Sequence, residues 1–205
     1  ERSLQYYDLD LVPSGEEEVF VDVGAYVGDS VLDFIKSYGI QYRKIYAYEP
    51  DGNNAEKLAE NTERYHDIVI RRKGAGKEQG EFSIIKGTDP SANHLGREAE
   101  ERDSQERDMD RVEVVTLDED IAEPVTWIKM DIEGAEYDAL QGASEHIKKD
   151  RPKLSISVYH GYDDLWRLPK LIYEMVPSYR FYLRYYGGNL IPTEIVLTAL
   201  PAEEQ

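Results

Sequence analysis

The sequence predicts an α/β domain built on an open, largely parallel β-sheet with helices on both faces. Short apolar runs alternate with amphipathic stretches of helical spacing from Val19 onward. The last two apolar runs, residues 181–186 and 191–200, flank a glycine-bearing turn and indicate an antiparallel hairpin. The chain has 205 residues and no internal repeat, which suits one domain of this kind. Strand–helix alternation that ends in a hairpin is typical of a parallel sheet with one reversed strand.

The elements follow one another in regular order along the chain. Apolar or alternating runs predict strands at residues 19–23, 44–48, 68–70, 81–86, 112–117, 127–132 and 154–159, before the two hairpin strands. Apolar residues three and four positions apart predict helices at residues 30–38, 53–65, 136–149 and 165–176. Pro152 prevents the third of these helices from continuing.

Two segments fall outside this pattern. Residues 1–17 carry Tyr and acidic residues and form an N-terminal extension, either a short lid or a linker, ahead of the domain at residues 18–200. Residues 88–111 are highly charged. We expect a flexible loop there, either fully solvated or acting as a lid over the site.

The composition excludes several kinds of partner and chemistry. The chain has 24 basic and 42 acidic residues, a net charge of −18, which argues against nucleic acid and against anionic membranes. No apolar run approaches the roughly 18 residues that span a bilayer. The absence of Cys excludes disulfides, thiolate metal sites and cysteine nucleophiles, and fits a cytoplasmic protein.

A glycine turn follows the first predicted strand. Gly24 and Gly28 are spaced G-x-x-x-G, and Tyr26 stands where a dinucleotide-binding turn needs its second glycine. This disfavours NAD and FAD. Asp22, at the end of the strand, would repel a phosphate and would suit an ammonium group. The simpler alternative is a structural strand–helix turn.

Glu49 ends the second predicted strand and adds a second ligand group. A carboxylate at this position can accept both hydroxyls of a ribose. The alternative is an acid that caps the helix after Asp51 and Gly52. An acid for an amino group and an acid for a ribose together describe a nucleoside linked to an amino acid, as in S-adenosylmethionine (SAM).

An acidic cluster follows the strand at residues 127–132. Alternation places Lys129, Asp131 and Glu133 on one side of the strand tip, and Glu136 opens the next helix. Three carboxylates can serve base catalysis or bind Mg²⁺ or Ca²⁺, and the spacing does not separate the two. The simpler interpretations are a helix-terminal acid for Glu136 and an ion-pair partner for Lys129.

His160 stands at the carboxyl end of the strand at residues 154–159. It is a candidate general base or a residue that orients the substrate, because its ordinary pKa lies near neutral pH. The alternative is a structural or solvated histidine. We assign no role to His66 or His146.

Four segments carry a family resemblance: residues 22–30, 48–50, 129–136 and 157–160. Together they resemble the FkbM family of SAM-dependent methyltransferases over residues 18–200, most specifically in Lys-Met-Asp-Ile-Glu-Gly-Ala-Glu at 129–136. The resemblance implies a Rossmann-like class I methyltransferase fold, with a seven-stranded, mostly parallel sheet and a C-terminal antiparallel hairpin. It also implies SAM as cofactor and O-methylation of a sugar, glycan or polyketide-like small molecule.

The matching positions assign site residues by resemblance. The cofactor positions are Asp22, Gly24, Ala25, Tyr26, Gly28, Ser30, Glu49, Pro50 and Asp131. No acid follows the third strand, so the adenine falls to the backbone of Gly74 and Ala75. The candidate catalytic residues are Asp131 and His160, one of them the base, with Glu133 and Lys129 orienting the substrate or partner groups. No metal ligand is assigned.

Two alternatives stay open. The chain can be a non-catalytic SAM-binding or interaction domain of a larger biosynthetic protein. It can also be a metal-dependent O-methyltransferase that uses Asp131, Glu133 and Glu136.

Overall fold

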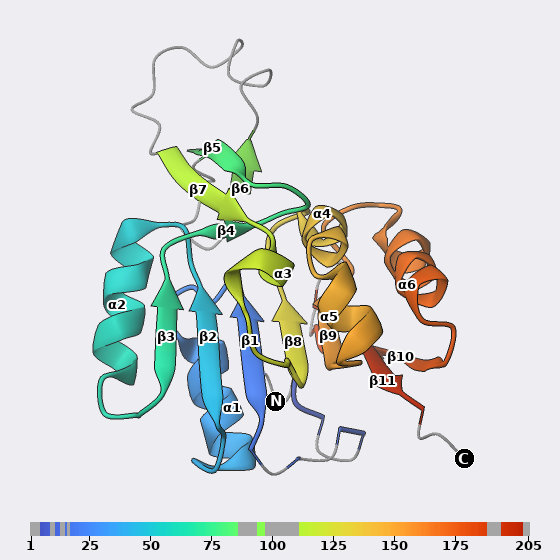
Figure 1. Ribbon diagram of the computed structural model, residues 1–205, viewed down its shortest axis with the longest axis horizontal. Coiled ribbons are helices and arrows are strands. Elements are labelled where there is room, and N and C mark those ends of the chain that lie inside the picture. The colour runs from blue at the N-terminus through green and yellow to red at the C-terminus, as the bar shows by residue number, and fades with distance from the viewer. Residues whose placement is uncertain are drawn as a thin grey trace.

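The main sheet has seven strands, and its order confirms the predicted fold class. The computed structural model describes residues 5–8, 11–12, 15, 17–85, 94–96, 111–187 and 194–202. The sheet order is β10-β11-β9-β8-β1-β2-β3 (Figure 1). Its strands are β1 (Val19–Val23), β2 (Lys44–Tyr48), β3 (Ile68–Arg71), β8 (Trp127–Met130), β9 (Lys153–Ser157), β10 (Tyr179–Tyr185) and β11 (Ile195–Pro201). All neighbouring pairs are parallel except those of β11, which runs antiparallel to β9 and β10.

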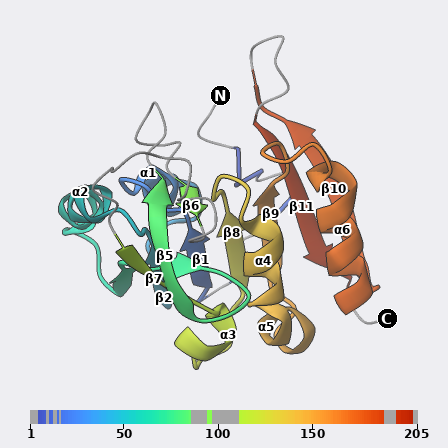
Figure 2. The ribbon, with the colours of Figure 1, turned by 90° about the horizontal axis from the view of Figure 1, so that it is seen from above.

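Helices cover both faces of this sheet (Figure 2). One face packs against α1 (Asp29–Tyr38) and α2 (Gly52–Thr62). The other packs against α3 (Leu117–Asp120), α4 (Glu136–Gln141), α5 (Ser144–Lys149) and α6 (Asp164–Met175). None of these helices has the length and apolar character needed to cross a bilayer.

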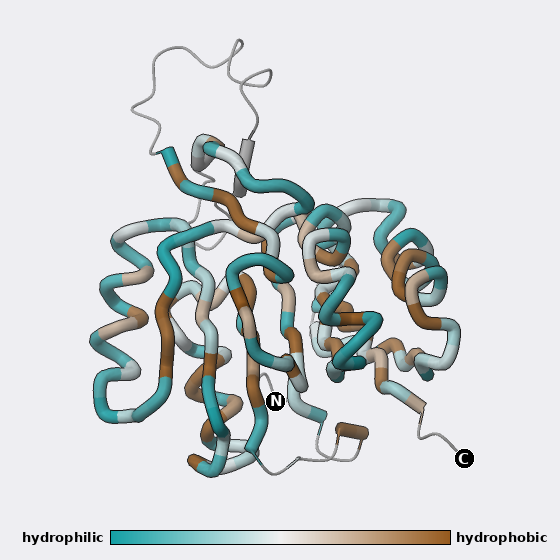
Figure 3. Tube along the Cα trace, viewed as in Figure 1, coloured by the Kyte–Doolittle hydropathy of each residue, from teal (hydrophilic) through white to brown (hydrophobic). Residues whose placement is uncertain are grey.

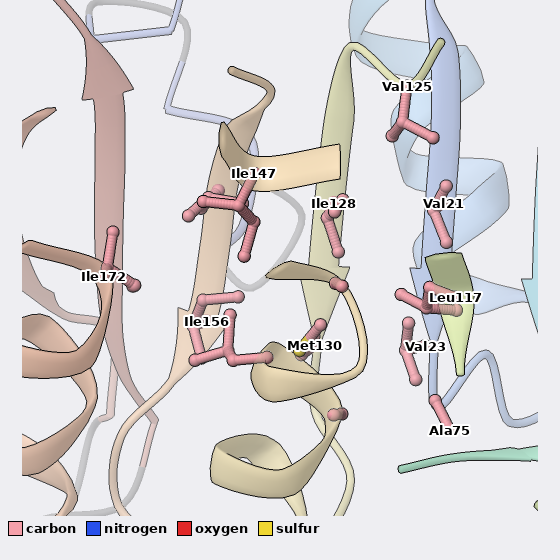
Figure 4. Close-up of a cluster of buried hydrophobic side chains, with 14 of the residues drawn as sticks. Val21, Val23, Ala75, Leu117, Val125, Ile128, Met130, Ile147, Ile156 and Ile172 are labelled. Carbon is pink, nitrogen blue, oxygen red and sulfur yellow. The ribbon is translucent and has the colours of Figure 1, made fainter. Parts of the chain in front are cut away.

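The alternation of side chains along β1 creates two cores. Val21 and Val23 join a largely aliphatic core with Ile128 of β8 and Leu117 of α3 (Figure 4). Phe20 points to the opposite face, where it stacks on Phe34 of α1 with ring centroids 4.3 Å apart. Hydrophobic residues accordingly concentrate along the central strands in Figure 3. Every residue of β1 is buried, which is typical of a central parallel strand.

A second, four-stranded sheet lies over the carboxyl ends of the central strands (Figure 1). Its order is β4-β7-β5-β6, from β4 (Gly74–Ala75), β5 (Gly80–Ile85), β6 (His94–Gly96) and β7 (Arg111–Val115). The sequence predicted β5 and β7 but not their separation from the main sheet. In β7, exposed Arg111 and Glu113 alternate with buried Val112 and Val114, which suits a strand with one solvated face.

The predicted helix over residues 136–149 is wrong in one respect, because it is divided into α4 and α5. Gly142 lies between them, so close to the chain after β4 that a Cβ there would stand 1.9 Å from the carbonyl oxygen of Gly76. The Asp118 carboxylate then accepts the backbone N–H groups of Glu145 and His146 at 2.9 and 3.0 Å. A contact from another helix therefore caps α5, and local periodicity does not reveal it.

The described part of the N-terminal segment packs against the domain. Tyr7 is 1% exposed and packs edge-on against Phe20, Phe34 and Trp127. Tyr7 is thus part of the domain core, and Tyr6 is partly buried against it. The charged segment at 88–111 lies outside the described residues, apart from β6 and Arg111, and so do residues 188–189 of the hairpin turn.

Candidate active site

The predicted site residues lie at one edge of the main sheet. β1 pairs in parallel with β2 and β8, and β8 pairs in parallel with β9. The glycine turn, Glu49, the acidic cluster and His160 each follow one of these four strands, so they meet at the shared carboxyl edge. Ligands of open α/β sheets bind at this edge.

The glycine turn is fixed to both neighbouring strands. The N–H groups of Gly24 and Ala25 both donate to the carbonyl oxygen of Tyr48, at 3.0 Å. Gly24 has φ +80°, and a Cβ there would stand 2.0 Å from the carbonyl oxygen of Asp131. Gly28 has φ +90° and lies against Leu58 of α2. Glycine is therefore required at position 24 for conformation and for space.

Asp22 and Lys129 form a buried ion pair beneath this turn. They are partners in register between β1 and β8, and the Lys129 Nζ lies 2.9 Å from the Asp22 Oδ1. The Ser30 hydroxyl donates to the other oxygen of Asp22, and the Lys129 Nζ donates to the carbonyl oxygen of Gly24 at 2.8 Å. Asp22 is completely buried. The ammonium group that Asp22 contacts in this structure is that of Lys129, and its predicted contact with the ammonium group of a cofactor stays a prediction.

Burial acts on both members of this pair. It raises the pKa of Asp22, and Lys129 and the Ser30 hydroxyl oppose that effect only in part. Burial lowers the pKa of Lys129, but the negative charges of Asp22 and Asp131 outweigh it, so the pKa is raised overall. Lys129 thus remains a cation without solvent contact, and it orients partner groups of the protein.

Glu49 lies at the end of β2 with its carboxylate facing the turn. It accepts the N–H groups of Tyr26 and Asp51, both at 2.9 Å. Burial raises its pKa to about 7, against the effect of these two hydrogen bonds. The cap of α2 is Asp51, which accepts from Asn53 and Asn54. The alternative interpretation of Glu49 as the helix cap is therefore wrong.

The segment predicted to hold an adenine forms β4. Gly74 and Ala75 are buried and pair with Val114 and Val115 of β7 at the edge of the second sheet. Pro50 precedes the cap of α2 and is half-buried. Their contact with a nucleoside stays a prediction.

The acidic cluster surrounds His160. The Nδ1 of His160 lies 2.9 Å from the Oε1 of Glu136. Its Nε2 faces the Asp131 Oδ1 at 3.3 Å and the Glu133 Oε2 at 3.7 Å. The side chain of His160 is 8% exposed, whereas those of Asp131 and Glu133 are 25% and 34% exposed. The two acids that the sequence predicted for the reacting centre are therefore the accessible ones.

Glu136 holds the turn after β8. Its two oxygens accept the N–H groups of Ile132 and Gly134 at 2.9 and 3.0 Å. It is 1% exposed, so it cannot meet a substrate. Glu136 therefore positions both the turn and His160.

The surrounding charges set the proton on His160. Burial alone would lower its pKa, but the hydrogen bond that it donates to Glu136 and the charges of Glu136, Asp131 and Glu133 raise it to about 9. The imidazole is thus protonated at neutral pH. In this state it donates hydrogen bonds and cannot accept a proton.

Asp131 has tyrosine partners that include one the sequence did not identify. The Tyr6 hydroxyl donates to its Oδ2 at 2.6 Å, and the Tyr159 hydroxyl reaches its Oδ1 at 3.3 Å. Tyr6 lies in the segment predicted to be an extension. The available signal was the adjacent pair Tyr6-Tyr7 in an otherwise charged segment.

Asp131, Glu136 and His160 each offer a possible metal ligand, and these atoms lie within 4.8 Å of one another. Both oxygens of Glu136 already accept backbone N–H groups, and the Nδ1 of His160 lies against one of them. The predicted metal set differed, with Glu133 in place of His160. We derive no step through a metal from this group.

Fold and site together define a domain of the SAM-dependent methyltransferase class. The chain belongs to the FkbM methyltransferase family: the family model described as "Methyltransferase FkbM domain" matches residues 22–188. This match confirms the predicted family, and with the family it supports the predicted cofactor, SAM. No curated protein matches the chain.

Solved structures share the fold. Methyltransferase FkbM from Methylobacillus flagellatus KT is 27% identical, with a TM-score of 0.79 over 96% of this chain and 47% of that one. The chain thus spans about half the length of that relative. Aeropyrum pernix fibrillarin, solved with natively bound S-adenosyl-L-methionine, has a TM-score of 0.54 at 9% identity, covering 92% of this chain and 69% of its own. The latter likeness concerns the fold alone.

Proposed function

We propose that the domain binds SAM at the carboxyl edge of β1 and β2 and transfers its methyl group to a hydroxyl oxygen. The proposed acceptor is a sugar, a glycan or a polyketide-like small molecule. The observation that carries the proposal is the partly exposed carboxylate of Asp131, held between Tyr6, Tyr159 and His160 next to the Gly24 turn.

The charges of the site fit this cofactor. The cluster has three carboxylates, from Asp131, Glu133 and Glu136, around the single imidazolium of His160. Its net charge is therefore negative. An excess of negative charge favours a sulfonium cation over a phosphate-bearing ligand. Glu49 would accept the ribose hydroxyls, while Gly24 and Ala25 would let the methionine part approach the backbone closely. Bound SAM supplies an electrophilic methyl group on sulfur.

Asp131 is the better candidate for the base. His160 already carries a proton at neutral pH, because its pKa is about 9. We therefore assign the acceptor's proton to the carboxylate of Asp131. The C–S bond breaks as the O–CH₃ bond forms, and the products are the methyl ether and S-adenosylhomocysteine (SAH). Positioning and this proton transfer supply the acceleration, and proton transfer contributes about 10²–10⁴-fold.

The other candidate residues then orient the reacting groups. The Nε2 of His160 faces Asp131 at 3.3 Å as an ion-pair partner, and Glu133 lies at the accessible rim of the cluster, 34% exposed. Tyr162 and Trp166 follow His160 and are 99% and 61% exposed. Exposed aromatic rings can pack on the apolar face of a sugar, so these two are candidates for an acceptor contact.

Two assays test the proposal. Calorimetry with SAH measures cofactor binding. Transfer of a labelled methyl group from SAM to a panel of monosaccharides, methyl glycosides and hydroxylated macrolactones then measures catalysis. We expect Asp131→Asn to abolish transfer while the Kd for SAH changes less than about threefold, a small free-energy difference. Cofactor binding without transfer to any member of the panel would favour a non-catalytic SAM-binding domain, which the twofold greater length of the Methylobacillus relative also permits.

A metal-dependent reaction makes a different prediction. Transfer that survives EDTA would exclude it, and transfer lost in EDTA and restored by Mg²⁺ would establish it. The net charge of −18 and the absence of Cys support the remaining parts of the proposal, namely a cytoplasmic location and a partner other than nucleic acid.

A further inference from the structure

Tyr6 reaches the proposed reaction centre from the start of the chain, 125 residues away from Asp131. We infer that Tyr6 is a positioning residue for methyl transfer, which fixes the carboxylate of Asp131 in the orientation that faces His160. The inference rests on the proposed function and adds a residue to it.

The two oxygens of Asp131 have different partners. The Oδ2 accepts the Tyr6 hydroxyl at 2.6 Å, the length of a strong hydrogen bond to a charged acceptor. The Oδ1 faces Tyr159 and the Nε2 of His160, both at 3.3 Å. A carboxylate that lacked the Tyr6 contact could rotate about its Cβ–Cγ bond, because the contacts on Oδ1 are longer. Tyr6 therefore fixes the plane of the carboxylate and keeps one of its oxygens directed toward the imidazole.

Tyr6 is itself held on several sides. Its hydroxyl lies 3.3 Å from the Ser157 Oγ and accepts from the Gln5 Nε2 at 3.1 Å. Its carbonyl oxygen accepts the Ser155 hydroxyl at 3.0 Å. The ring also covers the Lys129 ammonium at 5.0 Å, a cation–π contact. These contacts connect Tyr6 to β9 and to the ion pair beneath the Gly24 turn.

The next residue anchors the segment in the core. Tyr7 is 1% exposed, and its ring, which Tyr7→Phe would retain, packs edge-on against Phe20, Phe34 and Trp127. For Tyr6 to leave the site as a lid would, Tyr7 would have to leave the aromatic core. The buried position of Tyr7 therefore favours a Tyr6 that stays in the site and positions Asp131. It disfavours a Tyr6 that occupies the acceptor position and leaves when the acceptor binds.

The phenol keeps its proton in this setting. Burial, followed by the charge of Asp131, raises the pKa of Tyr6 well above its ordinary value. Tyr6 thus carries its proton at neutral pH and donates it in the hydrogen bond to Asp131.

A matched pair of variants tests the assignment. Tyr6→Phe and Tyr7→Phe each remove one buried phenol hydroxyl from adjacent residues, but only the first hydroxyl contacts Asp131. The chain has 4 His, so the pH titration of His160 can be followed by NMR and assigned with His160→Gln. The charged and titratable groups that face the imidazole are Glu136, Asp131, Glu133, Asp164 and Tyr159.

We expect Tyr6→Phe to lower the titration midpoint of His160 by about 0.5 pH unit, because a rotated Asp131 stabilises the imidazolium less well. Tyr7→Phe should leave the midpoint unchanged. In an Asp131→Asn background the effect of Tyr6→Phe should disappear, as expected when one residue acts through the other. A midpoint that Tyr6→Phe leaves unchanged or raises would overturn the assignment.

Methyl transfer provides the second measurement. Tyr6→Phe should reduce kcat about tenfold with the Kd for SAH unchanged, while Tyr7→Phe retains kcat. A faster Tyr6→Phe enzyme would contradict positioning and show that Tyr6 competes with the acceptor. The NMR experiment needs neither cofactor nor acceptor. Failure of SAH to bind would therefore refute the proposed function without deciding the role of Tyr6.

Discussion

The Nδ1 of His160 lies 2.9 Å from the Oε1 of Glu136, the most deeply buried carboxylate of the cluster. Glu136 therefore fixes the imidazole on the side away from the accessible acids. The opposite nitrogen consequently faces the two accessible acids, Asp131 and Glu133. This arrangement makes His160 a cation that is hydrogen-bonded to Glu136 and faces Asp131 as an ion-pair partner. Of the two roles that the sequence left open for His160, general base or orienting residue, this arrangement favours the second.

The first prediction concerns the charge of His160. NMR should place its titration midpoint near 9, because three carboxylates stabilise the imidazolium. Glu136→Gln should lower the midpoint by about 1 pH unit or more, since the hydrogen-bonded anion is the largest of the favourable causes. A midpoint below 7 in the unmodified protein would contradict the assignment of Asp131 as the base.

The same group makes stability depend on pH. The folded state binds the proton of His160 more tightly than the unfolded chain, where the pKa is about 6.5. The contribution to the free energy of unfolding is therefore complete below about pH 6.5 and is lost as the pH rises through about 9. In urea unfolding we expect the free energy of unfolding to fall by on the order of 2–3 kcal/mol between these pH values. His160→Gln should lack this part of the pH dependence.

The second prediction concerns cofactor affinity and Glu49. Its pKa is raised to about 7 by burial, and the ionised form is the one that accepts ribose hydroxyls. Affinity for SAH should therefore fall as the pH is lowered through 7, with a Kd about tenfold higher at pH 6 than at pH 8. Glu49→Gln should bind more weakly and without this dependence. The exposed Glu56 of α2 provides the control, since Glu56→Gln should retain the full dependence.

The third prediction compares two glycines that both have positive φ. Gly24 has φ +80° and would place a Cβ 2.0 Å from the Asp131 carbonyl oxygen, whereas Gly39 has φ +86° and no atom within 4 Å of its added Cβ. Gly39→Ala should cost about 2 kcal/mol of stability from backbone strain alone, because φ +86° with ψ −172° lies in a region almost confined to glycine. Gly24→Ala should cost more than about 3 kcal/mol and eliminate SAH binding. The reason is that the Gly24 turn and the segment that follows β8 at Asp131 must move apart to make room for the Cβ. Equal effects in thermal unfolding would refute this account of the turn.

The fourth prediction concerns the buried pair of Asp22 and Lys129. Lys129→Met leaves Asp22 charged and unpaired in the core, which should destabilise the protein by about 3–5 kcal/mol. Adding Asp22→Asn removes that charge, so the double variant should be more stable than Lys129→Met. A double variant that is less stable than the single one would show that the pair does not act as a unit. Denaturant unfolding measures all three proteins.

Much of the fold is predictable because its strands have local signatures. The buried runs of β1, β2, β8 and β9 and the parallel order place Asp22, Glu49, Asp131 and His160 at one edge without any knowledge of tertiary contacts. The division of the helix at Gly142 is not predictable in this way. Its cause is the approach of the chain at Gly76, 66 positions earlier in the sequence.

The roles of site residues depend on contacts that the sequence does not contain. Asp22 was predictable as a residue of the edge, but its burial against Lys129 follows from strand register. The proton on His160 depends on Glu136, whose distance from it is set by the turn at Gly134. Tyr6 was not predictable as a site residue, because only the packed position of Tyr7 brings it to Asp131.

Calorimetric titration of the intact protein with SAH at pH 8 is the most direct test of the central claim, a SAM site at the carboxyl edge of β1 and β2. We expect one molecule of SAH to bind per chain, with affinity weakened at least about tenfold in Glu49→Gln. The absence of both heat and a thermal shift, in protein that NMR shows to be folded, would contradict the claim.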